Sequence, residues 1–358
     1  MQSAKTHVRQ RIIDHKFSQK VKMINFLSLS ILNNFICYAD KIILTPKLSI
    51  IRLDKISDPR AVAILGDEAI ELAKDVDPRA YKSGSHKLIP VRFGVDFVHR
   101  AIEISNFALQ WQYVDEGLEN FPNDFERTAN LVWFSSAITS LRLLKKEFIA
   151  RFPTQSVGDP NTSTVQGGLV ISSPIEEEDF ITSKVPHLAS VYVLTTSDIE
   201  NLKKVLNAVN SSRNTNILIA ISRLNRQYSR DKIEDRLIDL VIGFESLYLV
   251  GINDELKFRL ALRVSAHLGK IESLDRQKIY EIISSAYIIR SKLVHGVIND
   301  IKNSKEFKKG SWVKPSYFLD ELTDLLRTAI FEILVNIGKQ EFKSQFHKNL
   351  DNLIIQGI

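Results

Sequence analysis

The placement of the prolines constrains this chain more than any other feature. Nine of the ten prolines lie between Pro46 and Pro186, the tenth is Pro315, and none occurs from His187 to Lys314. Proline is nearly excluded from helix interiors, and apolar residues recur at three- and four-residue spacing through this run. The pattern therefore predicts a helical bundle in the C-terminal half.

The N-terminal half shows patterns of both strands and helices. Its strand signals are alternation and short β-branched runs, found at Val91, Phe93, Val95 and Phe97 and in Ile42–Leu44, Leu169–Ile171 and Val191–Leu194. The segment Met23–Cys37 is different, because Leu27, Ile31 and Phe35 stand at helical spacing. We predict an amphipathic helix there, packed on the body, since polar residues interrupt the segment and it is too short to span a membrane.

The chain of 358 residues is long enough for two domains. Thr154–Ser173 is rich in Gly, Ser, Thr, Asn and Pro, leads to the acidic run Glu176–Asp179, and is the best predicted linker. We expect an α+β chain, with a mixed α+β domain of sensory or regulatory role at residues 1–195 and an all-α helical bundle at residues 196–358.

Charge and cysteine content narrow the partners and the compartment. Residues 201–358 hold 25 Lys or Arg and 18 Asp or Glu, so an anionic partner is expected in the C-terminal half. Cys37 is the only cysteine, which excludes an intrachain disulfide and a cysteine zinc cluster and fits the reducing cytoplasm. No glycine pattern of a phosphate loop or a dinucleotide site occurs, so no cofactor, metal or membrane association is expected.

Helix ends can be predicted within the proline-free run. The signals are a capping box at Ser197 and Glu200, a cap at Asn253 or Asp254, a left-handed stop at Gly269, a cap at Ser273 or Asp275, and a first-turn proline at Pro315. A last amphipathic segment is predicted over about Gln340–Ile355.

Arg290 and His295 are the residues best suited to chemistry, near the end of the predicted helix that runs out at Gly296. RNA carries its own nucleophile in the 2′-hydroxyl, so its cleavage needs a base and a cation that stabilises the phosphorane. An imidazole with a pKa near 6.5 suits the first role, and a guanidinium that contacts two phosphate oxygens suits the second. Five helical residues subtend about 140° beyond a full turn. His295 must therefore lie at the helix end, or a second copy must complete the site.

Three strings in this order closely resemble the HEPN superfamily, specifically its Apea-like branch: Asp235–Tyr248, Glu255–Arg263 and Tyr287–Gly296. The resemblance covers roughly Leu206–Ile337. It implies a dimerising helical bundle, with Arg290 and His295 as the catalytic pair of a metal-independent endoribonuclease in the dimer cleft. It also suggests a cytoplasmic role in bacterial antiviral defence or a toxin system, with an unknown trigger or inhibitor. The family often has Asn, Asp or His where this chain has Ser291.

Several other residues have two interpretations each. Glu245, in an apolar helix segment, either pairs with Arg290 or faces solvent, while Tyr287 and Lys292 either touch substrate or serve packing and solvation. The remaining charged candidates either form an RNA track or are ordinary surface charges, namely Arg236 with Asp239, and Arg259 with Arg263. His267 is expected to be a packed residue.

Two functions follow from these observations. The first is an endoribonuclease that dimerises and cleaves RNA by transesterification, leaving a 2′,3′-cyclic phosphate and a 5′-hydroxyl. The alternative is a non-catalytic HEPN module that binds RNA or a partner protein.

Overall fold

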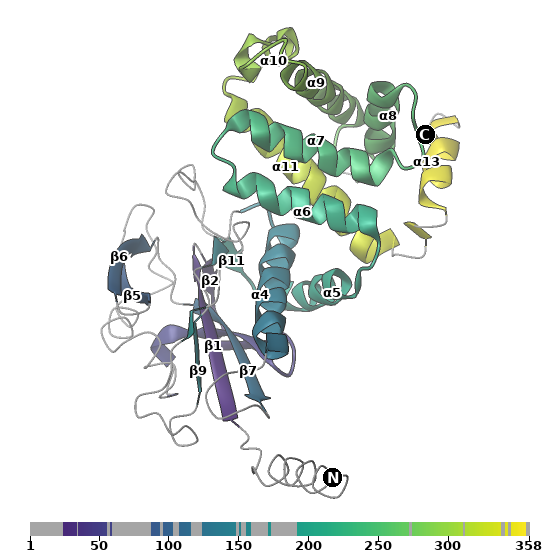
Figure 1. Ribbon diagram of the computed structural model, residues 1–358. Coiled ribbons are helices and arrows are strands. Elements are labelled where there is room, and N and C mark those ends of the chain that lie inside the picture. The colour runs from purple at the N-terminus through teal and green to yellow at the C-terminus, as the bar shows by residue number, and fades with distance from the viewer. Residues whose placement is uncertain are drawn as a thin grey trace, which may run out of the picture.

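The computed structural model describes residues 24–33, 35–55, 58, 87–93, 96–102, 107–115, 124–147, 150–151, 155–158, 171–172, 192–271, 274–310, 312–337, 341–342 and 345–355. Figure 1 shows a sheet built from the N-terminal part and a stack of helices built from the C-terminal part. Helix α4 lies between them.

A mainly antiparallel sheet forms the N-terminal region, and its central strand is β1 (Ile24–Asn33). The strand order is β10-β9-β1-β7-β4-β3, and β8 also pairs with β1. The bounds of the other strands are β3 (Lys41–Ile43), β4 (Leu48–Arg52), β7 (Phe107–Asp115), β8 (Ala150–Arg151), β9 (Gln155–Gly158) and β10 (Ile171–Ser172). A 3₁₀ turn, η1 (Leu53–Lys55), follows β4.

The predicted helix over Met23–Cys37 is wrong, because this segment forms strand β1 and the short strand β2 (Phe35–Cys37). The antiparallel partners of β1 are β7 on one edge and β9 on the other. Ser28 and Ser30 are buried beside Leu27 and Leu29. The serines that suggested a solvent-facing helix side therefore lie inside the sheet region.

Other strand predictions are confirmed in part. Two further small sheets are present, formed by β2 with β11 (Tyr192–Leu194) in parallel and by β5 (Lys87–Phe93) with β6 (Asp96–Ile102) in antiparallel. The alternation from residue 91 to residue 97 belongs to this hairpin rather than to a single strand. Within the linker predicted at 154–173, the structure places β9 and β10, while the acidic run at 176–179 lies outside the described residues.

The described residues from 198 onward form helices and contain no strand, which confirms the helical C-terminal region. These helices are α5 (Asp198–Ser211), α6 (Thr215–Ser229), α7 (Ile233–Tyr248), α8 (Leu256–Leu268), α9 (Arg276–Val294), the 3₁₀ helix η3 (Ile301–Asn303), α10 (Lys305–Lys309), α11 (Pro315–Phe331), the π-helix η4 (Glu332–Ile337) and α13 (Phe346–Ile355). Helix α4 (Asp124–Leu144) precedes them in the chain.

Two of the predicted helix starts are confirmed by their capping geometry. Asp275 is the N-cap of α9 and accepts hydrogen bonds from the backbone N–H groups of Gln277 and Lys278. Pro315 is the first residue of α11. A short acidic side chain at the N-cap accepts hydrogen bonds from N–H groups that have no partner within the helix. Proline is tolerated in the first turn because its missing N–H would have no such partner there.

The other predicted helix ends lie at or next to the predicted residues but differ from the prediction in their geometry. Ser197 precedes α5 without a side-chain cap, because its hydroxyl pairs with the Thr195 hydroxyl at 2.9 Å. The N-cap of α8 is Glu255, with φ of 53°, rather than Asn253 or Asp254. Helix α8 does end before Gly269, but that glycine has φ of −68° and is not left-handed.

Two apolar clusters make up the core, and α5 contributes to both. Leu202 and Leu206 of α5 pack in the cluster of the sheet region, whereas Val205 and Val209 pack in the cluster of the helical bundle. Leu202 and Leu206 are four residues apart and share one face of the helix, as do Val205 and Val209 on the adjacent face, so one helix can serve both clusters. The two regions therefore share α5 in their hydrophobic cores.

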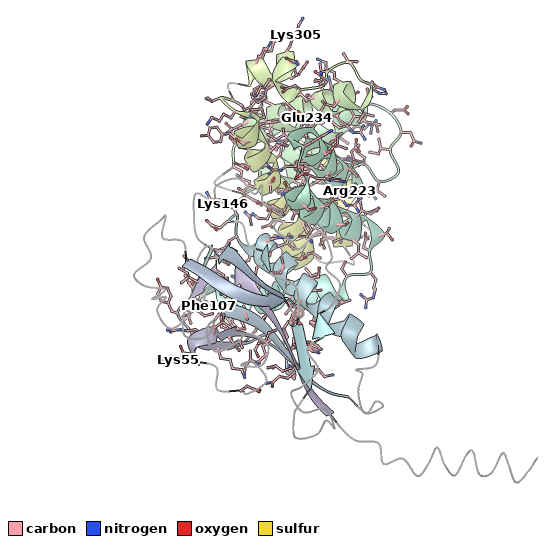
Figure 2. The ribbon with its side chains drawn as sticks, turned by 60° about the vertical axis from the view of Figure 1, so that its left-hand side comes forward. Lys55, Phe107, Lys146, Arg223, Glu234 and Lys305 are labelled. Carbon is pink, nitrogen blue, oxygen red and sulfur yellow. The ribbon has the colours of Figure 1, made fainter. Side chains whose placement is uncertain are left out.

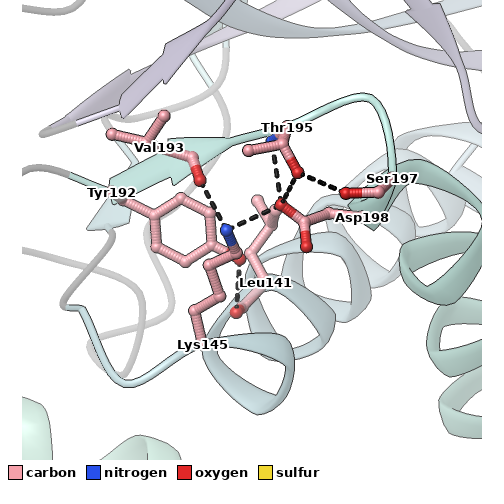
Figure 3. A network of polar contacts seen from close by, with 7 residues as sticks. All are labelled: Leu141, Lys145, Tyr192, Val193, Thr195, Ser197 and Asp198. Carbon is pink, nitrogen blue, oxygen red and sulfur yellow. Dashed lines mark hydrogen bonds and ion pairs between the residues drawn. The ribbon is translucent and has the colours of Figure 1, made fainter.

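Polar contacts fix the start of α5 against the end of α4 (Figure 3). The Lys145 ammonium lies 2.6 Å from the Asp198 carboxylate and donates to the Val193 carbonyl at 2.8 Å. The hydroxyl and backbone N–H of Thr195 also donate to Asp198. Burial opposes ionisation of Asp198, but these hydrogen bonds outweigh it, so the pKa of the carboxyl is lowered.

Candidate functional site

Helix α9 carries the candidate site near its C-terminal end. The helix stops sharply because Gly296 has φ of +69°, a conformation that glycine adopts without a steric penalty. The N–H of Val297 donates to the Lys292 carbonyl at 2.8 Å, and the N–H of Gly296 donates to the Leu293 carbonyl at 3.1 Å. This pair of bonds is a Schellman motif, which satisfies the last carbonyls of the helix. The helix end is therefore fixed rather than frayed.

Arg290 pairs with Glu245 of α7, as one of the two sequence interpretations predicted. Nη2 of Arg290 lies 3.4 Å from Oε2 of Glu245, and their side chains are 25% and 21% exposed. Burial raises the pKa of the Glu245 carboxyl, and the positive charge of Arg290 opposes that rise. Nε of Arg290 is buried and has no hydrogen-bond partner in the part of the chain that the structure describes. The guanidinium is held at one end and retains an unused donor.

An open pocket of about 610 Å³ surrounds this ion pair. Helices α6, α7 and α9, the turn after α7 and the start of α8 supply its walls, which consist of Asn216, Ile219, Ile242, Glu245, Ser246, Leu249, Val250, Gly251, Ile252, Leu256, Tyr287 and Arg290. The Ser246 hydroxyl donates to the carbonyls of Gly243 and Asn216, so it ties α7 to the start of α6. The pocket therefore combines an apolar wall with one cation and one carboxylate.

Tyr287 lies one helical turn before Arg290 and lines the same pocket. It is partly buried and also packs against the hydrophobic core of the bundle. Burial raises the pKa of its phenol, the Glu245 carboxylate adds to the rise, and Arg290 opposes it. Tyr287 therefore both packs against the core and faces the pocket as a neutral hydroxyl.

His295 does not line the pocket. It is the C-cap residue of α9 and is exposed to solvent. Among the described residues, its imidazole has no hydrogen-bond or ion-pair partner. Five residues along a helix give an axial rise of about 7.5 Å and a rotation of about 140° beyond one turn, so Arg290 and His295 face different directions within one chain.

Lys292 also lies outside the pocket, because it binds another part of the bundle. Its ammonium lies 2.8 Å from a carboxylate oxygen of Glu306 on α10, and the Ser304 hydroxyl binds the same oxygen. Burial alone would raise the pKa of Glu306, but hydrogen bonds from Lys292 and Ser304 lower it to about 2. Lys292 thus anchors α10 to α9.

The proposed RNA track through Arg236, Asp239, Arg259 and Arg263 is not supported by their positions. Asp239 is buried and binds two arginines, Arg223 at 2.6 Å and Arg230 at 2.7 Å. Arg236 is largely buried and donates to Gln227. Only Arg259 is an ordinary surface charge, with an exposed ion pair to Glu255 on the same helix.

Arg263 joins the last helix to the bundle instead of facing solvent. Its guanidinium makes two hydrogen bonds to Asp351 of α13, of 2.8 and 2.6 Å, and donates to the Tyr248 carbonyl. The Arg263 side chain is 5% exposed. A paired fork of this kind satisfies a buried guanidinium, so both the track and the surface-charge interpretation of Arg263 are wrong.

His267 is a packed residue, as expected. Its Nδ1 lies 2.6 Å from the Tyr248 hydroxyl, and its ring packs edge-on against Phe346. Burial lowers the pKa of His267 to about 4, and the charge of Lys270 adds to this effect. The imidazole is therefore neutral near pH 7.

Sequence reasoning missed the contribution of α6 to the pocket. Asn216 and Ile219 belong to a helix whose amphipathic pattern predicts packing but not which helices it faces. Ser246, directly after Glu245, was the available signal, because a second polar residue in that apolar segment also needed a partner.

No group of three or more His, Cys, Asp or Glu side chains with the geometry of a metal site occurs in the described residues. In the same residues, no helix combines the length and the apolar character that a membrane span requires. Comparison of the chain with protein-family models, with curated proteins and with solved structures found no match in any of the three.

Proposed function

We propose that this protein is a metal-independent endoribonuclease whose helical bundle is HEPN-like and dimeric. The observation that carries the proposal is the arrangement of α9. It presents a guanidinium held by Glu245 in an open pocket, and it ends in a fixed turn with an exposed imidazole. These are the two groups that RNA transesterification requires.

The proposed reaction gives each residue one role. His295 removes the proton from a 2′-hydroxyl, the 2′-oxygen attacks the adjacent phosphorus, and the bond from phosphorus to the 5′-oxygen breaks. The leaving 5′-oxygen receives a proton, from the protonated imidazole or from water, and the products are a 2′,3′-cyclic phosphate and a 5′-hydroxyl. Arg290 binds the non-bridging oxygens, where negative charge grows in the transition state.

The divergence of Arg290 and His295 supports a site shared between two copies. Pairing about a two-fold axis can place His295 of one copy opposite Arg290 of the other, although the two side chains diverge within a single chain. We therefore assign the active species as a homodimer. The N-terminal region at residues 1–195 is proposed to sense a trigger or restrain the nuclease, in a cytoplasmic setting of bacterial antiviral defence or a toxin system.

Single-turnover cleavage of a generic RNA in EDTA tests the proposal. His295→Ala should slow cleavage by about 10² to 10⁴, because it removes proton transfer, while RNA affinity stays near that of the wild type. Arg290→Lys should also slow it, because lysine cannot contact two oxygens in one plane. The matched control is Arg259→Lys, an exposed arginine of the same bundle, which should cleave at the wild-type rate. Products that end in a 3′-hydroxyl would contradict the assigned chemistry.

A mixture of two inactive variants tests the shared site. If each site takes Arg290 from one copy and His295 from the other, a heterodimer of Arg290→Ala and His295→Ala contains one intact site. Mixing the two variants should then restore cleavage, and each heterodimer should have up to about half of the activity of a wild-type dimer. Absence of restoration, with mixed dimers demonstrated by tagged subunits, would assign both groups to one chain.

A non-catalytic module of the same fold is the second candidate function. Two observations favour it, namely that Glu245 already occupies one end of the Arg290 guanidinium and that His295 lies outside the pocket. Such a module would bind RNA or a protein partner. RNA binding without cleavage by the wild type, in the presence and absence of EDTA, would support this candidate over the nuclease.

A further inference from the structure

The helical region carries a strongly basic surface that the pocket does not use. Five lysines with exposed side chains lie on the segment that includes η3, α10 and the turn before α11, and we call them the lysine surface: Lys302, Lys305, Lys308, Lys309 and Lys314. Figure 2 shows Lys305 at the end of the bundle farthest from Lys55 and Phe107 of the sheet region.

The described residues do not neutralise the charge of this surface. In the segments that the structure describes, none of the five ammonium groups has an ion-pair or hydrogen-bond partner. The neighbouring carboxylates are engaged elsewhere, because Glu306 binds Lys292 and Glu321 binds Lys278 and the Trp312 indole. Five positive charges on 13 residues therefore face solvent, and their field favours a polyanion.

The backbone beneath the lysines is held firmly. The buried hydroxyl of Ser304 accepts a hydrogen bond from the N–H of Glu306 and caps α10. Phe307 stacks on Trp312 at 6.1 Å and packs edge-on against Phe318 at 6.3 Å. Only the lysine side chains have to become ordered on binding, so the entropic cost to the backbone is small.

The lysine surface is anchored to the helix that ends at His295. The ion pair between Lys292 and Glu306 fixes α10 to the last turn of α9, and His295 follows Lys292 by three residues. Beyond Lys314, the aromatic ring of Tyr317 is 54% exposed. Positive charges with an exposed aromatic ring are the combination that binds single-stranded nucleic acid, because phosphates bind the charges and bases stack on the ring.

We propose that the lysine surface binds the phosphate backbone of single-stranded RNA and directs the strand toward His295. The inference that the RNA strand is directed toward His295 rests on the proposed function, whereas the inference that the lysine surface binds RNA does not. An anionic membrane fits less well, because Val313 and Tyr317 are the only strongly exposed large apolar side chains among the described residues of this segment and the first turn of α11, and α10 has five residues. Membrane-surface helices present a much larger apolar face.

Affinity for an RNA that cannot be cleaved tests the proposal. The probe is a fluorescent 20-nucleotide 2′-O-methyl RNA, measured by anisotropy over a series of salt concentrations. The variant is Lys305→Ala/Lys308→Ala/Lys309→Ala. The control is Lys55→Ala/Lys146→Ala/Lys204→Ala, which changes the net charge equally. It removes three exposed lysines that have no ion-pair partner among the described residues and lie in the sheet region, just after α4, and on α5.

The surface variant should lose at least about tenfold in affinity. The plot of log K against log salt should become less steep by about 2, because each phosphate contact to a single strand contributes about −0.7 to the slope and three contacts are lost. The control should stay within about twofold of the wild type. Circular dichroism and thermal unfolding confirm that both variants are folded.

Binding to phosphatidylserine vesicles is measured in parallel. Four results would overturn the proposal: equal loss in the control, no loss in the surface variant, no RNA binding by the wild type, or a surface variant that loses vesicle binding and keeps RNA binding. Cleavage is scored separately. If RNA binding depends on the lysine surface and the wild type cleaves nothing, the proposed nuclease fails and the lysine surface stands. If His295→Ala abolishes cleavage and the surface variant binds normally, the nuclease stands and the lysine surface fails.

Discussion

Arg142 on α4 and Asn225 on α6 lie 83 residues apart in the sequence and are joined by a buried hydrogen bond of 2.9 Å between Nη1 and Oδ1. The Asn225 amide also donates to the Thr139 hydroxyl at 2.8 Å. The Arg142 guanidinium stacks 4.8 Å from the ring centre of Tyr228. These contacts connect the helix that covers the sheet to a helix that lines the candidate pocket.

Asn225→Ala should destabilise the protein by about 1–3 kcal/mol, because it removes a partner from two buried polar groups. Urea unfolding followed by circular dichroism measures the change. Asn201→Ala, an exposed site on α5, serves as the control and should change stability by less than about 0.5 kcal/mol. Equal effects of the two substitutions would show that the buried contacts do not stabilise the junction.

Gly296→Ala should cost about 1 kcal/mol, because an L-residue with a Cβ is strained at φ of +69°. An added Cβ meets no atom within 4 Å, so the cost is conformational and not steric crowding. Gly296→Asn should cost less, since asparagine tolerates the left-handed region. Thermal unfolding of the two variants checks the order, and an alanine variant as stable as the wild type would contradict the assigned helix end.

His267 should make the protein less stable as the pH falls below 6.5. Its pKa is about 4 in the folded protein and near 6.5 when unfolded, so the unfolded chain binds more protons in this window. The loss should reach about 2 kcal/mol at pH 5 and about 3 kcal/mol below pH 4. His267→Gln keeps an acceptor for Tyr248 and should remove this part of the pH dependence. Denaturant unfolding of both proteins at pH 7.5 and pH 5 provides the comparison.

Glu245→Gln should slow the proposed RNA cleavage by about tenfold while affinity for RNA changes little, because Glu245 positions the guanidinium and does not touch the substrate. Stability should change by less than about 1 kcal/mol, since the pair is partly exposed and 3.4 Å long. Glu234→Gln on the same helix is the control. A cleavage rate unchanged in Glu245→Gln would show that Arg290 needs no such support.

The helices were predictable from sequence where local chemistry decides them. The absence of proline allows helices to continue, and the N-cap Asp275 and the first-turn Pro315 each determine where a helix begins within one or two turns. The structure confirms both helix starts. The strand β1 was not predictable in this way, because its backbone pairs with β7 and β9, and its serines are buried in the sheet region that these strands help to form. The β7 residues paired with Ser28 and Ser30 are Trp111 and Leu109, about 80 residues away in the chain.

The candidate site shows the same division. The pairing of Glu245 with Arg290 was one of two predicted alternatives, because a carboxylate in an apolar helix segment needs a cation. The partners of Asp239 and Arg263 were not predicted, since Arg223, Arg230 and Asp351 are brought to them by helix packing. The positions of Lys292 and His295 outside the pocket likewise depend on which face of α9 packs against α7.

Because α5 is part of both hydrophobic cores, neither region can lose its core without exposing one side of the same helix. Unfolding the sheet region would expose Leu202 and Leu206 to water. Only Val205 and Val209 would then keep α5 packed on the bundle, so the helix would lose part of its hydrophobic stabilisation. Any event that loosens the sheet therefore lowers the stability of the nearest helix of the bundle. The N-terminal half can influence the C-terminal half through this shared free energy, without a mobile linker or a second contact surface.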